Sequence, residues 1–454
     1  MTLTAPQVLP APPWRPAPGQ QHVLDNGLSV IVHPLPGQSM ARVVLNLGIP
    51  VSAETTDLDG IAAVMAACLL QGSGDLGATE FADAVAELGA TVATTVDHTG
   101  PRLVCDVPAY RLGPALELLA SALIHPRFAL TEVTRQIQIA IGEASREDDS
   151  PAGRAHRMMF SLLYGQHERI SRPAAGSRTS LERLMKIPHI VSAFHGTHLT
   201  PRRVTVVVAG DVVPATVRQL VAEAFGDWTA TAVRADYRSG PPRPLETPGR
   251  VLLHRAGMPQ AYLLLAQPTI GIAHPDWPAV RLAAGIMGVP ATGRLDARIR
   301  ETQGVTYGLR ATPEPLLADA GIFTVSGAVA VDKTVDVLQS VRDILLDAST
   351  AGFTDAETRQ VRAMAAASTR LGHETAAQVA DRSSQHAAYG LSPGTFGDDA
   401  AAAADTTTAD IQAAYRAHLD PSRLAALVVV GDADILFDEL VDHELVGPLR
   451  VESS

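Results

Sequence analysis

The segment His198–Asp211, HLTPRRVTVVVAGD, recurs later in the chain as His418–Asp432, HLDPSRLAALVVVGD. The offset is 220 residues at the start and 221 at the end (418 minus 198 and 432 minus 211), with one small gap. Just upstream, Ala193-Phe194 recurs as Ala414-Tyr415, at an offset of 221 (414 minus 193). A repeat of this length is far longer than the units of solenoid proteins, so it indicates duplication of a whole domain. The 454 residues are enough for two such domains.

Each half of the chain mixes short strands with helices. Asn26-Gly27, between the apolar residues of 22–33, is the strongest short signal for a β-hairpin. Helices are predicted over 58–70, which is apolar almost all round and therefore buried, and over 180–198. In the second half, a helix predicted over 279–287 takes the same place in the order as 58–70. We therefore predict an α+β fold in which helices cover one face of an antiparallel sheet in each half, and the halves close like a clamshell.

The middle of the chain has the composition of a domain linker. Between Gly226 and Arg250 it becomes rich in proline and glycine, with SGPPRPLETPG at the centre. Four parts follow from this boundary: a Pro-rich tail over 1–20, an N-terminal domain over 21–228, a linker over 229–249 and a C-terminal domain over 250–454.

Charge and cysteine content limit the possible partners and location. The formal net charge of −12 and the pI near 5.6 argue against a nucleic-acid partner, which would need a basic patch. The two cysteines, Cys68 and Cys105, show no CxxC spacing, so we predict reduced structural thiols and a cytoplasmic location. The Pro-rich N-terminus lacks the basic and apolar regions of a signal peptide. No run approaches the roughly 18 apolar residues that a membrane helix needs, so no membrane partner is expected.

The stretch Arg294–Tyr307, RLDARIRETQGVTY, is a candidate for chemistry. Its apolar spacing predicts a helix that a left-handed glycine at Gly304 would end, followed by the start of a strand. Arg300 and Tyr307 would then lie on either side of a sharp reversal. A guanidinium and a phenol in that arrangement suit a carbonyl oxygen or an oxyanion. From this stretch alone, a surface arginine and a half-buried tyrosine are the favoured interpretation.

Several motifs at matching spacings resemble one known family. They are DNGLSV at 25–30, FADAVAELGA at 81–90 followed by TVATTVDHT at 91–99, and RIRETQGVTYG at 298–308. From about His22 to Asp432 the chain resembles the half-size (M16B) members of the M16, pitrilysin-type metallopeptidases, which include the mitochondrial processing peptidase (MPP) subunits. The resemblance implies two homologous α/β-sandwich-like domains of the LuxS/MPP-like metallohydrolase fold, produced by tandem duplication.

The zinc motif of that family is degenerate in this chain. The family binds zinc through the histidines of an inverted motif, H-x-x-E-H, whose glutamate is the general base. Reading forward from Gly60, these three positions fall on Ala63, Ala66 and Ala67. Glu143 follows Ala67 by 76 residues (143 minus 67), where the resemblance places a third, glutamate ligand. Catalytic zinc usually needs three protein ligands. We therefore expect no metal and no cofactor in this chain, and interpret Glu143 as a solvated residue on a helix face.

The resemblance gives Arg300 and Tyr307 a role. In the family, an arginine and a tyrosine seven residues apart complete the active site from the second half, and the spacing here matches. Their implied work is to hydrogen-bond the substrate backbone and the carbonyl oxygen as it becomes an oxyanion. Because this chain lacks the zinc ligands, the pair could act only in trans, with a zinc bound by a partner.

Half-size members of the family commonly work as pairs, which suggests a partner. The prediction is the non-zinc subunit of a heterodimeric zinc metallopeptidase, with a subunit that carries H-x-x-E-H and the zinc, cutting peptides such as leader or precursor peptides. The alternative is a non-catalytic structural or peptide-binding homologue, against which the Arg300 and Tyr307 pair argues. A self-sufficient peptidase is nearly excluded by the three alanines.

Three further motifs carry little weight. Gly72–Gly77 has the form GxGxxG, but a helix precedes it where a dinucleotide site needs a strand. His195 and His198 have no carboxylate partner in view, which favours a structural role. His373-Glu374 begins like HExxH, but its fifth position is Ala377.

Overall fold

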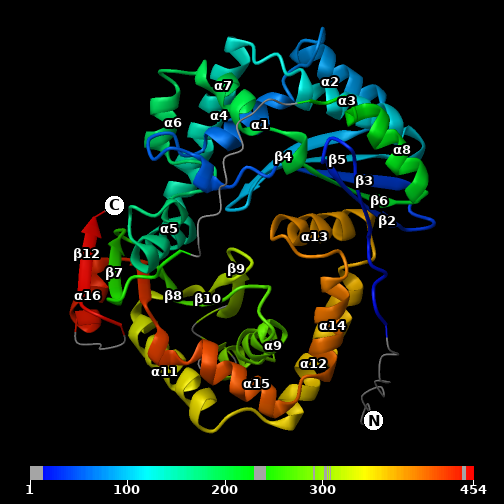
Figure 1. The fold of residues 1–454 in the computed structure, drawn as a ribbon. Coiled ribbons are helices and arrows are strands. Elements are labelled where there is room, and N and C mark those ends of the chain that lie inside the picture. Colours follow the sequence, from blue (N-terminus) through cyan, green and yellow to red (C-terminus); the bar gives the residue numbers. More distant parts are fainter. Residues whose placement is uncertain are drawn as a thin grey trace, which may run out of the picture.

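The computed structural model describes residues 14–229, 242–289, 292–300, 304, 306, 308–441 and 446–453. Within these residues the strands form two six-stranded sheets, one in each half of the chain. The sheet of the first half has the order β1-β2-β6-β3-β5-β4, and that of the second half has the order β12-β7-β11-β8-β10-β9. From β2 and β7 onward the two orders are equivalent position by position. The predicted duplication of a sheet-plus-helix domain is confirmed (Figure 1).

The first half contains the following elements. Its strands are β1 (Gln20–Val23), β2 (Ser29–Pro34), β3 (Met40–Asn46), β4 (Thr91–Asp97), β5 (Gly100–Pro108) and β6 (Thr205–Gly210). Its helices are α1 (Ile61–Leu69), α2 (Ala78–Glu87), α3 (Leu112–Ile124), α4 (Leu130–Asp149), α5 (Pro151–Tyr164), α6 (Arg178–Leu184), α7 (Ile190–His198) and α8 (Pro214–Phe225).

The second half repeats this plan. Its strands are β7 (Gly249–His254), β8 (Gln260–Ile270), β9 (Arg310–Pro315), β10 (Ala320–Ala330), β11 (Ala426–Gly431) and β12 (Leu449–Ser453). Its helices are α9 (Trp277–Gly288), α11 (Thr334–Thr350), α12 (Asp355–Leu371), α13 (Ala376–Ala388), α14 (Thr395–Asp405), α15 (Thr408–Ala414) and α16 (Ala433–Val441), with π-helical turns η5 (Asp296–Arg300) and η7 (Tyr415–Leu419).

The sheets are mixed, which corrects the purely antiparallel sheets expected from the sequence. Strand β6 pairs parallel with β2 and antiparallel with β3, and β11 does the same with β7 and β8. The helices α3 to α7 separate β6 from β5 along the chain, so β6 returns to the sheet after a long connection. A connection of that kind permits parallel pairing, whereas a tight hairpin does not.

One face of each sheet is covered by helices of its own half. Along a strand, alternate side chains point to opposite faces. In β2, Val30 and Val32 enter the core beneath the helices of the first half, while Ile31 belongs to a separate cluster on the opposite face. The second half has the same division, with Leu252 on one face and its neighbour Val251 on the other.

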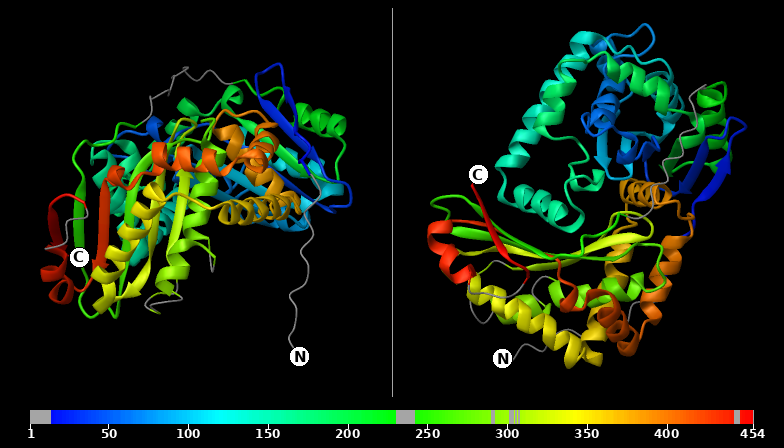
Figure 2. Two further views of the ribbon diagram at one scale, coloured as in Figure 1. Left: turned by 90° about the horizontal axis from the view of Figure 1, so that it is seen from below. Right: turned by 60° about the vertical axis from the view of Figure 1, so that its left-hand side comes forward.

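The opposite face of each sheet is covered by a helix from the other half. Helix α5, which follows α4 in the first half, packs on β7, β8 and β11. Helix α13, which follows α12 in the second half, packs on β3 and β6. Figures 1 and 2 show these two crossing helices on opposite sides of the molecule, with the halves facing each other between them. The clamshell is therefore joined at two places by an exchange of helices.

Most of the predicted elements are present. The Asn26-Gly27 hairpin forms, with Gly27 at φ +89°, and helix α1 lies inside the predicted range 58–70. The prediction of one helix over 180–198 is wrong. Helices α6 and α7 are separate, and Pro188 lies in the gap between them. The predicted linker lies partly outside the described residues, and its described end leads into β7. No helix in the described part of the chain is long and apolar enough to cross a membrane.

Candidate functional site

The start of helix α1 is held by close backbone contacts. Gly60, immediately before the helix, has φ +92°, and a Cβ there would lie 2.4 Å from the carbonyl oxygen of Ala175. Gly176 has φ +90°, and its own Cβ would lie 2.5 Å from the carbonyl oxygen of Asp59. Only glycine allows this mutual approach without displacing backbone. The two glycines thus place the first turn of α1 directly against the segment 173–176.

A buried ionic network holds the same end of α1. The carboxylate of Glu54 accepts hydrogen bonds from the backbone N–H groups of Gly60 and Ala62, both at 3.0 Å, and pairs with Arg169 at 2.5 Å. Arg172 pairs with Asp59 at 2.6 Å. Burial raises the pKa of the Glu54 carboxyl, while Arg169 and the backbone donors oppose that rise. The network satisfies N–H groups that a helix start would otherwise leave without partners.

This network was not anticipated from the sequence. Glu54 and Asp59 precede α1 by a few residues, whereas Arg169 and Arg172 lie more than a hundred residues later. No local pattern links them. One feature of the sequence could have predicted it: Glu54 and Asp59 stand next to an almost wholly apolar, buried helix. A carboxylate buried there needs a cationic partner.

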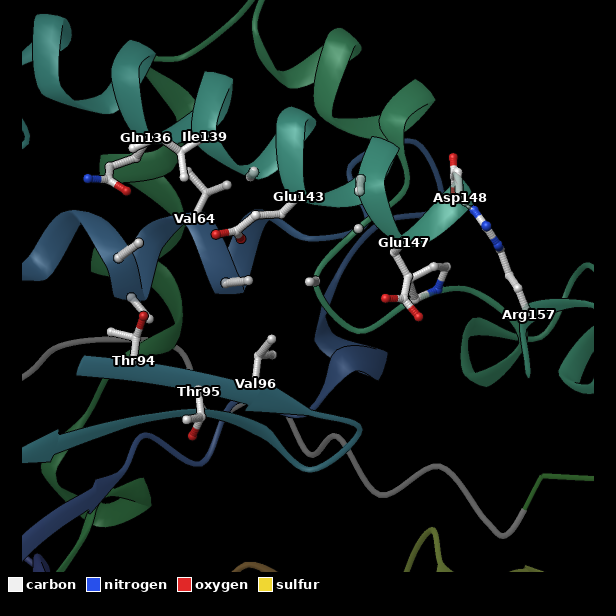
Figure 3. A pocket seen from close by; sticks show the side chains of 18 residues that line it. Val64, Thr94, Thr95, Val96, Gln136, Ile139, Glu143, Glu147, Asp148 and Arg157 are labelled. Atoms are coloured by element: carbon white, nitrogen blue, oxygen red, sulfur yellow. Dashed lines mark ion pairs between the residues drawn. The ribbon is translucent and has the colours of Figure 1, made fainter. Parts of the chain in front are cut away.

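Helix α1 forms one wall of a cavity of about 460 Å³. The opposite wall is α4, the floor is the strand β4, and the segment 173–176 closes one end (Figure 3). Its lining includes residues of α1, β4, α4 and α5, among them Ala63, Ala66, Ala67, Thr94, Thr95, Val96, Glu143, Glu147, Asp148 and Arg157. The cavity therefore joins four elements that lie far apart in the sequence.

The three alanines predicted at the degenerate zinc motif all line this cavity. Ala66 is 1% exposed, and Ala63 and Ala67 are partly exposed to the cavity. Glu143, from the facing helix α4, also lines it, and Figure 3 shows its carboxylate directed into the space. Glu143 is exposed, as predicted, but its exposure is to the cavity. The structure thus brings Ala63, Ala66, Ala67 and Glu143 together.

The cavity does not fit a catalytic zinc ion. Methyl groups offer no lone pair, and Glu143 and Glu147 are the carboxylates left over, because Asp148 is paired with Arg157. In the part of the chain that the structure describes, no three metal-binding side chains converge at this cavity. Catalytic zinc usually takes three protein ligands, with nitrogen donors prominent among them. What remains is an open cavity with small apolar side chains on α1 and two carboxylates on α4.

The second candidate site, around Arg300, lies in the other half. Arg300 ends the π-helical turn η5, and its side chain is 43% exposed. Gly304 has φ +66°, and its N–H donates to the carbonyl oxygen of Arg300 at 3.0 Å, so the predicted left-handed end of the helix is present. Thr306 then bridges to Val329 in antiparallel fashion, which matches the predicted strand start. Tyr307 lies outside the described residues.

A buried carboxylate organises this stretch. Asp296 is 1% exposed, and its oxygens lie 3.7 Å from Arg300 and 3.3 Å from Arg310. Gly308 has φ +129°, and a Cβ there would lie 2.7 Å from the same carboxylate. Asp296 was missed from the sequence, although its i, i+4 spacing to Arg300 is a signal for an ion pair. The arrangement holds Arg300 by its own helix and leaves much of its guanidinium open to solvent.

The remaining candidates have structural contacts. His195 bonds the carbonyl oxygen of Leu123 at 2.8 Å, and burial lowers its pKa. His198 packs on Phe194 with ring centroids 4.2 Å apart. Cys68 and Cys105 are free thiols, and burial raises the pKa of each to about 12. Thiols this buried and protonated are poor nucleophiles.

Comparisons with known proteins agree with this architecture. Residues 190–365 match the model of the M16 peptidase inactive domain. A Mycobacterium leprae protein named as an uncharacterised zinc protease is 27% identical over 344 residues, covering 74% of this chain and 75% of that protein.

Two solved structures share the fold. The peptidase M16 inactive domain from Pseudomonas fluorescens aligns with a TM-score of 0.81 at 20% identity, covering 95% of this chain and 100% of that one. A protease from Helicobacter pylori aligns with a TM-score of 0.83 at 17% identity, covering 91% and 100%. At these identities the two structures establish the fold alone.

Proposed function

Because the chain is a member of the M16 peptidase family, we propose that it is the non-zinc subunit of a heterodimeric zinc metallopeptidase. Its partner would be an M16 subunit with an intact H-x-x-E-H, which binds the zinc. This chain would supply Arg300 and Tyr307 to a peptide held between the two subunits. Leader and precursor peptides are the substrates to test first.

The observation that carries the proposal is the cavity beside α1. Ala63, Ala66 and Ala67 stand where the family has its zinc ligands and general base, yet the space around them is kept. A helix whose ligands were lost in a purely structural protein could have filled that space with larger side chains, since a cavity costs stability. Retention of an open cavity next to small side chains supports continued contact with a peptide.

The strand beside the cavity supports the same role. Within the described residues, β4 is the last strand of its sheet and pairs only with β5. An extended peptide can add to such an edge through backbone hydrogen bonds, while pockets select its side chains. Thr94, Thr95 and Val96 of β4 line the cavity, so a peptide on this edge would have side chains within its reach.

Arg300 is the described half of the proposed catalytic pair. Its partial exposure leaves N–H donors available, and the pairing with Asp296 restricts the side chain to one region. Donors aimed at a developing oxyanion often make the largest single contribution to catalysis, and loss of one costs roughly 10²–10³ in rate. The zinc of the partner would polarise the carbonyl and activate water.

Reconstitution tests this proposal. The purified chain is mixed with an M16 homologue from the same organism that has an intact H-x-x-E-H, and cleavage of a fluorogenic peptide library is followed. We expect activity from the mixture and none from this chain alone. In the mixture, Arg300→Ala and Tyr307→Phe should each lower kcat/KM roughly 10²–10³-fold.

A matched arginine variant controls for loss of charge. Arg218 lies on α8 and is exposed, so Arg218→Ala should leave both complex formation and activity unchanged. Size-exclusion chromatography would show that Arg300→Ala still forms the complex. Full activity with both Arg300→Ala and Tyr307→Phe would remove the catalytic role and favour the structural or peptide-binding homologue. Failure to associate with any such homologue would contradict the pairing itself.

A further inference from the structure

Three side chains that can bind metals meet in the second half, away from the cavity beside α1. His274 and Asp276 lie in the turn before α9, and His418 lies in the π-helical turn η7. In the described part of the chain, one ligand atom from each lies within 4.8 Å of those of the other two. In the sequence, His418 stands out only as part of the repeated segment.

Asp276 does not cap the helix that it precedes. It is the N-cap residue of α9, where an aspartate usually accepts a hydrogen bond from the first turn, but its side chain makes no such bond. Instead its Oδ2 lies 2.8 Å from Nε2 of His418, a residue 142 positions later in the chain. Helix α9 thus forgoes a cap so that this carboxylate can face an imidazole.

The second imidazole is brought to the same place by the turn itself. The backbone N–H of Asp276 donates to Nδ1 of His274 at 3.0 Å, and that nitrogen lies 3.9 Å from Oδ2 of Asp276. The rings of His274 and His418 meet edge to face with centroids 5.1 Å apart. Two imidazoles therefore flank one carboxylate.

The site rests on a rigid base. The carbonyl oxygen of His418 accepts hydrogen bonds from Nε2 of Gln267 at 3.0 Å and from Oγ1 of Thr269 at 3.2 Å, both on β8. Tyr415 and Leu419, which bound η7, are fully buried. Sites on supported elements keep their ligands in place, which metal binding requires.

Access to the site is open. The side chains of His274 and Asp276 are 39% and 49% exposed, and that of His418 is 15% exposed. His418 also lines an open cavity of about 520 Å³, together with Glu246 and Asp319. A cation could enter from solvent and keep a coordination position free for water.

We propose that His274, Asp276 and His418 form a binding site for a divalent transition-metal ion of the zinc class. Imidazole nitrogens with one carboxylate are a donor set that suits Zn²⁺, and three protein ligands leave its fourth position open. On binding, the proton shared by Nε2 of His418 and Oδ2 of Asp276 is released to solvent, and the ion takes its place with a small movement of the exposed carboxylate. This site is separate from the degenerate motif and does not depend on the proposed function.

Zinc titration by calorimetry tests the site. The chain is first treated with a chelator, and Zn²⁺ is then titrated into the wild type and into variants. We expect one zinc per chain, with an affinity lowered at least about 100-fold by His418→Ala, since losing even an outer-shell partner of a metal ligand costs 10–100-fold. Asp276→Asn should give a similar loss while keeping the side-chain shape and a hydrogen-bond acceptor for His418. Zinc should also raise the Tm of the wild type and not that of Asp276→Asn.

An exposed histidine elsewhere provides the control. His22→Ala, on the strand β1, should bind zinc as the wild type does. Equal zinc affinity in the wild type, His418→Ala and Asp276→Asn would place the ion elsewhere and overturn the inference. Absence of zinc binding to the wild type would mean that the three residues only fasten α9 to η7.

Discussion

The two halves of this chain have the same sheet order but differ in their candidate site residues. In the first half, Ala63, Ala66 and Ala67 line a cavity between α1 and α4. In the second half, the described part of Arg294–Tyr307 holds Arg300 on a buried carboxylate, at a place where the first half has no counterpart motif. Because the fold of each half needs only its apolar core and its sheet, the two halves can share it while these side chains differ.

The two crossing helices, α5 and α13, differ in the contacts that they make with the sheet of the other half. Helix α5 lies on the second sheet through buried apolar residues such as Met159 and Leu162. Helix α13 lies on the first sheet through buried apolar residues such as Val379 and Ala380. It also makes polar bonds there, in which Ser384 and Asn46 bond each other at 2.6 Å and Ser383 bonds His33 at 2.8 Å. Both helices are therefore held by apolar burial, and α13 has these side-chain hydrogen bonds in addition. The bond between Ser383 and His33 should respond to pH, because burial lowers the pKa of His33.

Restoring the zinc motif should give the largest effect and would remove the difference between the cavity and a true metal site. The triple variant Ala63→His, Ala66→Glu, Ala67→His recreates H-x-x-E-H on α1, facing Glu143 across the cavity. With three ligands present, we expect one zinc ion per chain at this cavity. The Asp276→Asn substitution removes zinc binding at the other proposed site. Metal analysis of the triple variant in the Asp276→Asn background measures the zinc at the cavity.

The role of Glu143 in that variant is the control. Adding Glu143→Gln to the triple variant removes the third ligand, so zinc affinity should fall at least about 100-fold, beyond the 10–100-fold that an outer-shell partner contributes. If the triple variant binds no zinc, then Ala63, Ala66 and Ala67 do not face Glu143 in ligand geometry. The interpretation of this cavity as a degenerate zinc site would then be wrong.

Shortening a buried apolar side chain of α5 should have the next largest effect. Leu162 is 5% exposed on α5, and its Cδ2 would lie 2.6 Å from a Cβ at Gly249, so it packs directly on the start of β7. Leu162→Ala should lower the free energy of unfolding by about 2–5 kcal/mol, from lost burial and the cavity left behind. Urea denaturation measures this loss.

An exposed leucine shows whether position matters. Leu371, at the end of α12, is 65% exposed, so Leu371→Ala should change the stability by less than about 0.5 kcal/mol. Equal losses in the two variants would mean that α5 does not hold the second sheet as its contacts indicate.

Acid should weaken the contact between α13 and the first sheet, and the effect should be smaller. Burial, with a further contribution from His373, lowers the pKa of His33 from 6.5 to about 4. Between these values the unfolded chain binds a proton that the folded chain does not, so stability is complete above pH 6.5 and is lost as the pH falls toward 4. The share of His33 in the loss between pH 7 and pH 5 should be about 1–2 kcal/mol.

A variant isolates that share. His33→Gln removes the titrating group and should flatten the dependence of unfolding free energy on pH, while His22→Gln, on the exposed strand β1, should retain the wild-type dependence. Other buried histidines, such as His386, have a similarly lowered pKa and will keep part of the acid sensitivity. Identical pH profiles for His33→Gln and the wild type would contradict the assignment.

Much of the fold could be predicted because its signals are local or repeated. Asn26-Gly27 needs left-handed backbone that few other residues accept, so it indicates a hairpin from two residues. Gly304 marks the end of its helix for the same reason. Repetition of His198–Asp211 at His418–Asp432 indicates the duplication because both copies must build the same buried strand. The family resemblance pointed to Ala63, Ala66 and Ala67, and all three line one cavity.

The tertiary structure decided what depends on residues that are distant in sequence. Parallel pairing of β6 with β2, exchange of α5 and α13 between the halves, and the contact of Glu54 with Arg169 leave no local pattern, because a side chain carries no record of its partner. The meeting of Asp276 with His418 is of the same kind. The sequence by itself determined the duplicated domains, since the repeat depends on residue type and spacing, and its resemblance to a known family predicts the loss of the zinc ligands. How the halves are joined, and which polar groups meet between elements, was decided by packing, since burial brings together whichever side chains the two sheets and their helices present.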